Sequence, residues 1–211
     1  MLLSDISEAL QKGQAKVVKE LVQTALDEGF APEDILRNGL LSGMDVIGAK
    51  FKNSEVFVPD VMIAARAMNM GVGVLKPYLA AAGNVSTGKV CIGTVSGDLH
   101  DIGKNLVKIM MEGKGLEVVD LGTDVSAETF ISTAIEQQCD VICCSALLTT
   151  TMSVMADVVK LAEEKGIRDK VKIMIGGAPV SEEYCRAIGA DAYTPDATTA
   201  ANVAAAFCRG E

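Results

Sequence analysis

The stretch 97–103, Gly-Asp-Leu-His-Asp-Ile-Gly, concentrates the side chains of this chain that could do chemistry. His100 is the only histidine among 211 residues. One carboxylate, Asp98, stands two positions before it, and another, Asp101, directly follows it. An imidazole beside a carboxylate suits a general base, a metal ligand or a pH-dependent switch. These three roles are the starting alternatives for the site.

The elements around this stretch place it on a strand-to-helix turn. The apolar run Val90–Val95 before it is typical of a buried strand, and the run 103–113 after it has the spacing of a helix. In open α/β sheets, ligands bind at the carboxyl ends of the strands. The lone imidazole is therefore predicted to lie at a ligand-binding edge.

Beyond Lys89, five short apolar runs alternate with helical stretches, which indicates a doubly wound parallel sheet of flavodoxin-like or Rossmann-like type. The predicted strands are Val90–Val95, Leu116–Leu121, Val141–Cys144, Val171–Ile175 and Ala190–Tyr193. The predicted helices are 103–113, 126–137, 152–165, 181–188 and 198–208. Five such units fit the strand order 2-1-3-4-5.

That strand order predicts a single crevice at the carboxyl edge of the sheet. The loops leaving strands 1, 3 and 4 should converge there, and all three are rich in small and hydroxyl residues. They are Ser96–Gly103, Ser145–Thr151 and Gly176–Val180. The end of strand 2, Gly122–Asp124, should lie nearby and is less distinctive.

The first third of the chain is predicted to be helical. Apolar positions recur at helical spacing over 4–28, 32–51 and 60–79, so a small antiparallel bundle is expected. Gly71 and Gly73 lie inside the last of these helices and are expected to permit close helix packing. The small, weakly polar segment 80–88 is interpreted as a linker and hinge between domains 1–83 and 84–211.

Composition narrows the class of protein. The formal net charge is −9 without a basic block, which disfavours nucleic acid and anionic membranes as partners. No apolar run approaches the roughly 20 residues of a membrane span, and the N-terminus lacks a basic leader, so a cytoplasmic protein is expected. The six cysteines form no C-x-x-C pair and are interpreted as small buried hydrophobes.

Several chemistries fit these residues poorly. The chain has no G-x-S-x-G elbow, no second imidazole for zinc, and no G-x-G-x-x-G after the first strand. A phosphorelay receiver would need an aspartate where Ser145 stands. One histidine can still serve a metal whose equatorial ligands come from a macrocycle. Asp98 would then fix the imidazole tautomer.

Three motifs resemble those of cobalamin-binding proteins. Residues 98–105, Asp-Leu-His-Asp-Ile-Gly-Lys-Asn, resemble the D-x-H-x-x-G signature, Ser145-Ala146-Leu147 the S-x-L motif, and Gly176-Gly177 the G-G motif. The helical segment with Phe57-Val58-Pro59 and 64–68 resembles the cap that precedes that fold. The two-domain layout is similar to stand-alone corrinoid proteins of methanol, methylamine, betaine and aryl-ether demethylation, and to the cobalamin module of methionine synthase.

The resemblance implies roles for particular residues. His100 would bind cobalt in place of the cofactor's own nucleotide base, with Asp98 as its catalytic partner. The displaced nucleotide tail would enter the predicted crevice, and Thr149, with Thr150 and Thr151, would add polar contacts. The cofactor-binding set is Gly97, Asp98, Leu99, His100, Asp101, Ile102, Gly103, Ser145, Leu147, Thr149, Gly176, Gly177 and, covering the upper face from the cap, Phe57, Val58 and Met62.

The function implied by the resemblance is methyl transport on cobalamin, as methylcobalamin or a related corrinoid. The chain would be a carrier subunit and not a complete enzyme. Its expected partners are a substrate-specific methyltransferase, a second methyltransferase acting on tetrahydrofolate or a thiol, and a reductive activase. The alternatives are a subunit of an adenosylcobalamin-dependent isomerase, disfavoured by the helical cap, and a cobalamin sensor, disfavoured by the lack of a basic patch.

Overall fold

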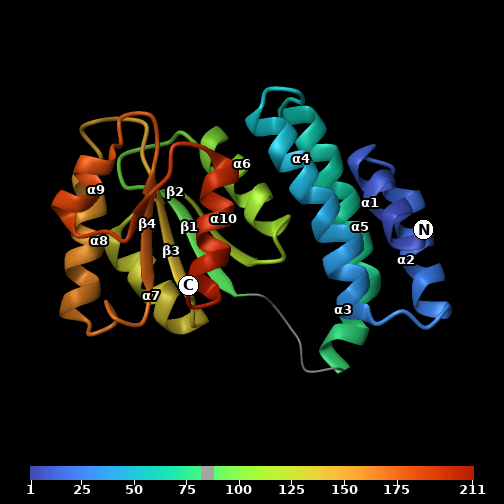
Figure 1. Cartoon of the computed structure of the whole chain (residues 1–211). Helices are drawn as coiled ribbons and strands as arrows, with labels where there is room; N and C mark the ends of the chain where they lie inside the picture. Colours follow the sequence, from blue (N-terminus) through green and yellow to red (C-terminus); the bar gives the residue numbers. More distant parts are fainter. Residues whose placement is uncertain (82–87) are drawn as a thin grey trace. The chain divides into compact units, whose positions relative to one another are not determined.

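A computed structural model describes residues 1–81 and 88–211, which form two compact units, one helical and one built on a sheet (Figure 1). The predicted domain boundary between residues 83 and 84 lies outside the described residues, as does most of the predicted linker and hinge. Each unit is therefore described by itself.

The helical unit contains more segments than periodicity predicts. They are α1 (Leu2–Gln11), α2 (Ala15–Asp27), α3 (Pro32–Asp34), the π-helical η1 (Ile35–Leu41), α4 (Ser42–Lys52) and α5 (Val58–Ala81). The prediction of one helix over 4–28 is wrong, because the chain turns at Gly13, whose φ of +67° lies in the left-handed region. The predicted start at Pro32 is confirmed.

Helix α5 is the central packing element of the helical unit. It contacts α1, α2, α4 and η1, and it buries Val61, Met68 and Leu75 against them. Among the described residues, Val58–Leu79 is the one helical stretch long and apolar enough to cross a membrane by length and composition. Part of that stretch is buried against neighbouring segments of the helical unit.

The second unit contains the predicted five-stranded parallel sheet in the order β2-β1-β3-β4-β5. The strands are β1 (Lys89–Val95), β2 (Glu117–Val125), β3 (Val141–Ser145), β4 (Lys172–Gly176) and β5 (Ala192–Tyr193). Strand β2 runs four residues beyond the prediction, through two register shifts against β1, so Gly122–Asp124 belongs to the strand and not to a loop. The topological switch point lies between β1 and β3, as predicted.

Helices cover both faces of the sheet (Figure 1). They are α6 (Ile102–Glu112), α7 (Ala127–Gln137), α8 (Ser153–Glu164), α9 (Glu182–Ile188) and α10 (Ala197–Cys208). Apolar residues of α7, α8 and α9 form one core with the sheet, around Phe130. The other face meets α6 and α10. Ser126 and Ser181 cap α7 and α9 as predicted, and all six cysteines are free thiols, five of them buried.

Two glycines of α5 make a matched test of helix packing. A methyl group at Gly71 would come within 2.9 Å of both terminal carbons of the buried Leu40, whereas one at Gly73 would meet nothing within 4 Å. We expect Gly71→Ala to lower the free energy of unfolding by about 1–3 kcal/mol through overpacking. Gly73→Ala should raise it by about 0.5–1 kcal/mol, because alanine favours the helix.

Urea denaturation of the two variants, followed by circular dichroism, measures both effects. A stabilising Gly71→Ala would contradict the assignment of Gly71 as the contact point between α5 and η1.

Candidate functional site

The carboxylate of Asp98 joins two loops of the sheet unit. Its side chain is 0% exposed, and the residue lies three positions after Val95, the end of β1. One oxygen accepts the backbone N–H of His100 at 3.1 Å, and the other accepts the N–H groups of Leu147 and Leu148 at 2.7 and 3.1 Å. The hydroxyl of Thr151 donates to that second oxygen at 3.1 Å. The loops after β1 and β3 are therefore held together by one buried anion.

These hydrogen bonds decide the charge of Asp98. Burial alone would raise the pKa of this carboxyl, but donation from Leu147, His100 and Leu148 outweighs burial and holds the pKa well below its ordinary value. Asp98 is thus ionised at neutral pH, and it can only accept hydrogen bonds.

The charge of Asp98 fixes the tautomer of His100. The imidazole Nδ1 lies 2.9 Å from Oδ1 of Asp98. Because an ionised carboxylate can only accept, Nδ1 must carry the proton that it donates. The lone pair of Nε2 is then available, and 56% of the side chain is exposed. The hydroxyl of Thr94 fixes the backbone by donating to the carbonyl of His100 at 2.8 Å. An imidazole held through one nitrogen and open at the other is the usual form of a metal-ligating histidine.

The loop that carries His100 is also tied to the end of β2. The carboxylate of Asp124 accepts the N–H of Gly97 at 2.7 Å and the hydroxyl of Ser96 at 3.1 Å, and the N–H of Asp124 donates to the carbonyl of Asp98 at 3.1 Å. Gly97 has a φ of +81°, which favours glycine there. Sequence analysis places this strand end nearby but assigns it no role.

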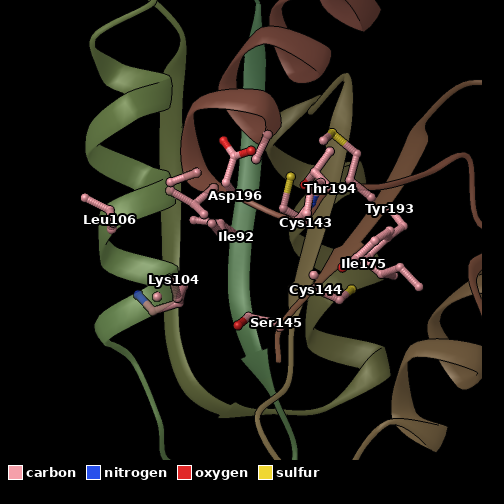
Figure 2. Close-up of a pocket in the computed structure, with 18 of the residues that line it drawn as sticks. Ile92, Lys104, Leu106, Cys143, Cys144, Ser145, Ile175, Tyr193, Thr194 and Asp196 are labelled. Atoms are coloured by element: carbon pink, nitrogen blue, oxygen red, sulfur yellow. The ribbon is translucent and has the colours of Figure 1, made fainter. Parts of the chain in front are cut away.

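A crevice of about 420 Å³ opens between the sheet and helices α6 and α10 (Figure 2). The predicted residues Ser145, Gly176 and Gly177 line it, as does Gly103. The predicted convergence of the three loops is confirmed, since the β1, β3 and β4 loops all contribute to this region. The lining combines small residues at the ends of β3 and β4 with larger apolar side chains such as Ile92, Met111 and Met174.

Gly177 is required at its position for two reasons. Its φ is +132°, and a Cβ there would lie 1.8 Å from the carbonyl oxygen of Ala146. The N–H of Ala146 in turn donates to the carbonyl of Gly176 at 3.1 Å. Any side chain at Gly177 would push the β3 and β4 loops apart and change the mouth of the crevice.

Two predicted contact residues lie elsewhere. The side chains of Leu147 and Thr149 do not line the crevice, and both residues are exposed. Leu147 acts through its backbone N–H, a contact that side-chain identity does not reveal. Of the three threonines, Thr151 is the one that bonds Asp98.

Other predicted residues surround the imidazole or lie in the helical unit. Leu99, Ile102, Leu147 and Leu148 are exposed apolar side chains on the two loops that Asp98 joins. Asp101 is exposed and accepts the side-chain amide of Asn105 at 3.0 Å, a local contact in the first turn of α6. The exposed cap residues are Phe57, Val58 and Met62. Their role over the cofactor stays a prediction.

A buried ion pair beside the crevice was missed by sequence analysis. The ammonium of Lys104 is 2% exposed and lies 2.6 Å from Asp120 of β2 and 2.8 Å from the amide oxygen of Asn105. Burial alone would raise the pKa of Asp120, but the bonds from Lys104, Gly122 and Lys108 lower it to about 2. A lysine on the inner side of an amphipathic helix is the signal that could have revealed this pair.

Comparison with known proteins agrees with this geometry. Residues 88–204 match the family model of a B12 binding domain, and residues 2–76 match a second B12 binding domain model. The chain is 41% identical over 206 residues to a corrinoid protein of Desulfitobacterium hafniense, covering 96% of this chain and 95% of that protein.

Two further relatives extend the comparison. A dimethylamine corrinoid protein of Methanosarcina acetivorans is 41% identical, with 94% of this chain and 93% of that protein covered. Among solved structures, a chain of the methanol:cobalamin methyltransferase complex of Methanosarcina barkeri matches with a TM-score of 0.87 and 31% identity, over 100% of this chain and 80% of that one.

Substitutions of the two aspartates around His100 are predicted to have unequal effects on stability. Asp98→Asn places an amide N–H₂ against the N–H and hydroxyl donors that surround the carboxylate, so we expect the free energy of unfolding to fall by about 2–4 kcal/mol. Asp101→Asn should change it by less than about 0.5 kcal/mol, as expected for an exposed site. Urea denaturation without cofactor measures both, and equal effects would contradict the role of Asp98 as the junction of the two loops.

The Lys104–Asp120 pair predicts a pH dependence of stability. Because the pKa of Asp120 is lowered on folding from 3.8 to about 2, its stabilising contribution is complete above about pH 5 and is lost as pH falls toward 2. The difference in unfolding free energy between the wild type and Asp120→Asn should therefore shrink between pH 5 and pH 3. When Lys104→Met is already present, this pH-dependent difference should mostly disappear. When Lys108→Met is present, more of it should remain, because the Lys108 side chain is more exposed than that of Lys104.

Proposed function

We propose that this chain, which belongs to the family of corrinoid proteins with B12 binding domains, carries a methyl group from a substrate-specific methyltransferase to a second methyltransferase. The final acceptor is tetrahydrofolate or a thiol. When bound, the corrinoid supplies a cobalt ion that accepts and releases the methyl group. The chain itself holds, orients and presents that cofactor.

The observation that carries the proposal is the state of His100. Its Nδ1 is bound by the buried anion Asp98, the side chain is 56% exposed, and the lone pair of Nε2 is not used in holding the ring. A carboxylate behind an imidazole raises its basicity and fixes its direction, which favours axial ligation of a metal. His100 thus serves as the lower ligand, and Asp98 as the group that holds it.

The crevice supports the second feature of the proposed binding mode, which is a separate site for the cofactor's nucleotide. If His100 occupies the lower axial position, the cofactor's own nucleotide must be displaced and needs a site of its own. The crevice lined by Ser145, Gly176 and Gly177 begins beside the His100 loop and lacks bulky side chains at these positions. Ser145 provides a hydroxyl that can donate to or accept from the tail.

The partners follow from the names of the relatives. Related proteins are named for dimethylamine and trimethylamine, and a solved relative belongs to a methanol:cobalamin methyltransferase complex. We propose a methylated amine or methanol as the methyl source, delivered by a cognate methyltransferase in the cytoplasm, with a reductive activase to restore the cofactor. Anaerobic incubation of the reduced holoprotein with candidate methyltransferases and each donor tests this choice.

Ligation by His100 can be tested with a single isotope, because the chain has one histidine. The protein is produced with ¹⁵N-histidine, loaded with cobalamin and reduced to the cobalt(II) state. We expect the nitrogen splitting in the electron paramagnetic resonance spectrum to change from a triplet to a doublet. His100→Ala should lose the doublet while keeping Asp98 in place.

The control is Asp101→Asn, which should retain the doublet because Asp101 makes only a local contact. A triplet that persists in the labelled protein would identify a nitrogen other than His100 and would contradict the proposed binding mode. Failure to retain any corrinoid would contradict the proposed function as a whole.

A further inference from the structure

We infer that Thr94 is a positioning residue for His100, and that its hydroxyl strengthens the ligation of cobalt by the imidazole. This inference rests on the proposed function, since it assumes that His100 is the lower ligand. It adds a residue of β1 that belongs to none of the three sequence motifs. Thr94 acts through the backbone of His100, and no contact between Thr94 and the cofactor is invoked.

The side chain of Thr94 lies on the face of the sheet that α6 and α10 cover. Along β1, Cys91 and Val95 belong to the core packed against α7 and α8, whereas Ile92 lines the crevice on the other face. Because side chains alternate along a strand, Thr94 shares the face of Ile92. Thr94 is also the last residue but one of β1, so it lies next to the start of the loop that carries His100.

A buried hydroxyl thus holds the backbone of an exposed imidazole. Thr94 is 0% exposed, and its Oγ1 donates to the carbonyl oxygen of His100 at 2.8 Å, six residues further along the chain. Water competes poorly for a donor in a buried site, so this hydrogen bond is stronger than one at the surface. Helix α6 begins two residues after His100, at Ile102, so the bond also joins the end of the strand to the start of the helix.

Three hydrogen bonds fix His100, and Thr94 makes the one that Asp98 cannot replace. Asp98 accepts the backbone N–H of His100 at 3.1 Å and its Nδ1 at 2.9 Å. Both bonds leave the peptide group on the carboxyl side of His100 without a constraint, and Thr94 binds that group. A residue held at both of its peptide groups has less freedom to lose when it binds a metal, and such preorganisation strengthens binding.

The neighbouring strands show that this end of the loop depends on β1. Thr94 pairs in register with Ser145 of β3, whereas β2 makes two register shifts against the last residues of β1. The shifted part of β2 carries Asp124, which binds the N–H of Gly97 at the beginning of the loop. Strand β2 therefore anchors the beginning of the loop, and Thr94 of β1 anchors its end at His100.

The strength of ligation determines the reduction potential of the cobalt. A lower ligand stabilises cobalt(II) relative to cobalt(I), which is four-coordinate, so the imidazole is released when cobalt(II) gains one electron. A tenfold loss of ligation therefore raises the potential of this one-electron couple by about 59 mV. We expect Thr94→Val to weaken ligation at least about threefold, which corresponds to a rise of about 28 mV.

Three variants separate the hydroxyl from the packing of the side chain. Valine is branched like threonine and lacks the hydroxyl, so Thr94→Val removes the donor at nearly constant shape. Thr94→Ser keeps the donor and should retain the wild-type potential. Ile142→Val is the control for a general loss of stability, because it removes a methyl group from a fully buried residue in the core on the other face of the sheet.

The experiment uses the full-length protein labelled with ¹⁵N-histidine and loaded with cobalamin. Electron paramagnetic resonance of the cobalt(II) state first establishes that the wild type shows the doublet expected for ligation by His100. Anaerobic spectroelectrochemical titration then gives the cobalt(II)/cobalt(I) potential of each variant. We expect the potential to rise in Thr94→Val, and to stay at the wild-type value in Thr94→Ser and Ile142→Val, although thermal denaturation should show that Ile142→Val is less stable than the wild type.

An unchanged potential in Thr94→Val would overturn the inference, as would an equal rise in Thr94→Val and Ile142→Val. If Thr94→Val does not fold, Thr94→Cys takes its place, because a thiol is a weaker donor than the hydroxyl of Thr94→Ser at nearly the same shape. Its potential should then rise above that of Thr94→Ser, and equal potentials would contradict the role of the hydroxyl. Failure of the proposed function has a different signature, since the wild type itself would then retain no corrinoid or would show a triplet.

Discussion

A buried negative charge at Asp98 is the constraint on which the rest of the site depends. A carboxylate without solvent contact is stable only if protein donors surround it, and here they come from two loops far apart in sequence. One buried anion therefore holds the loops after β1 and β3 together. The same anion also orients the imidazole of His100, because it accepts a hydrogen bond from Nδ1.

The sheet topology explains why this junction can form at all. With β1 between β2 and β3, the loops after β1 and β3 leave the sheet side by side but lead to helices on opposite faces. Asp98 closes the resulting gap on one side, and Asp124 anchors the same loop to β2 on the other. The crevice stays open along α6, where the Lys104–Asp120 pair connects that helix to the edge strand.

Most of the fold and the central residues of the site follow from sequence, and the exceptions have a common cause. Hydrophobic periodicity is a local signal, and it predicts the five strands. Their order follows from the fit of five alternating strand–helix units to the flavodoxin-like order, which also places His100 at the carboxyl edge of the sheet. Periodicity does not reveal the turn at Gly13, because that turn depends on one residue in the left-handed conformation. It also does not reveal that the backbone N–H of Leu147 donates to Asp98. Lys104 was missed because its partner Asp120 lies on another element, and Thr149 was preferred to Thr151 because spacing alone cannot rank neighbouring hydroxyls.

The surroundings of His100 are those of a residue that presents a cofactor. Exposed apolar side chains lie on the two loops that Asp98 joins, Leu99 and Ile102 on one and Leu147 and Leu148 on the other. Such side chains are costly in water and gain from contact with a broad apolar ligand face. The one imidazole uses Nδ1 to hold its position, which leaves the lone pair of Nε2 available. Under the proposed function, residues of a partner methyltransferase supply bond making on the substrate, and a carrier needs its cofactor-bearing face to be open to that partner.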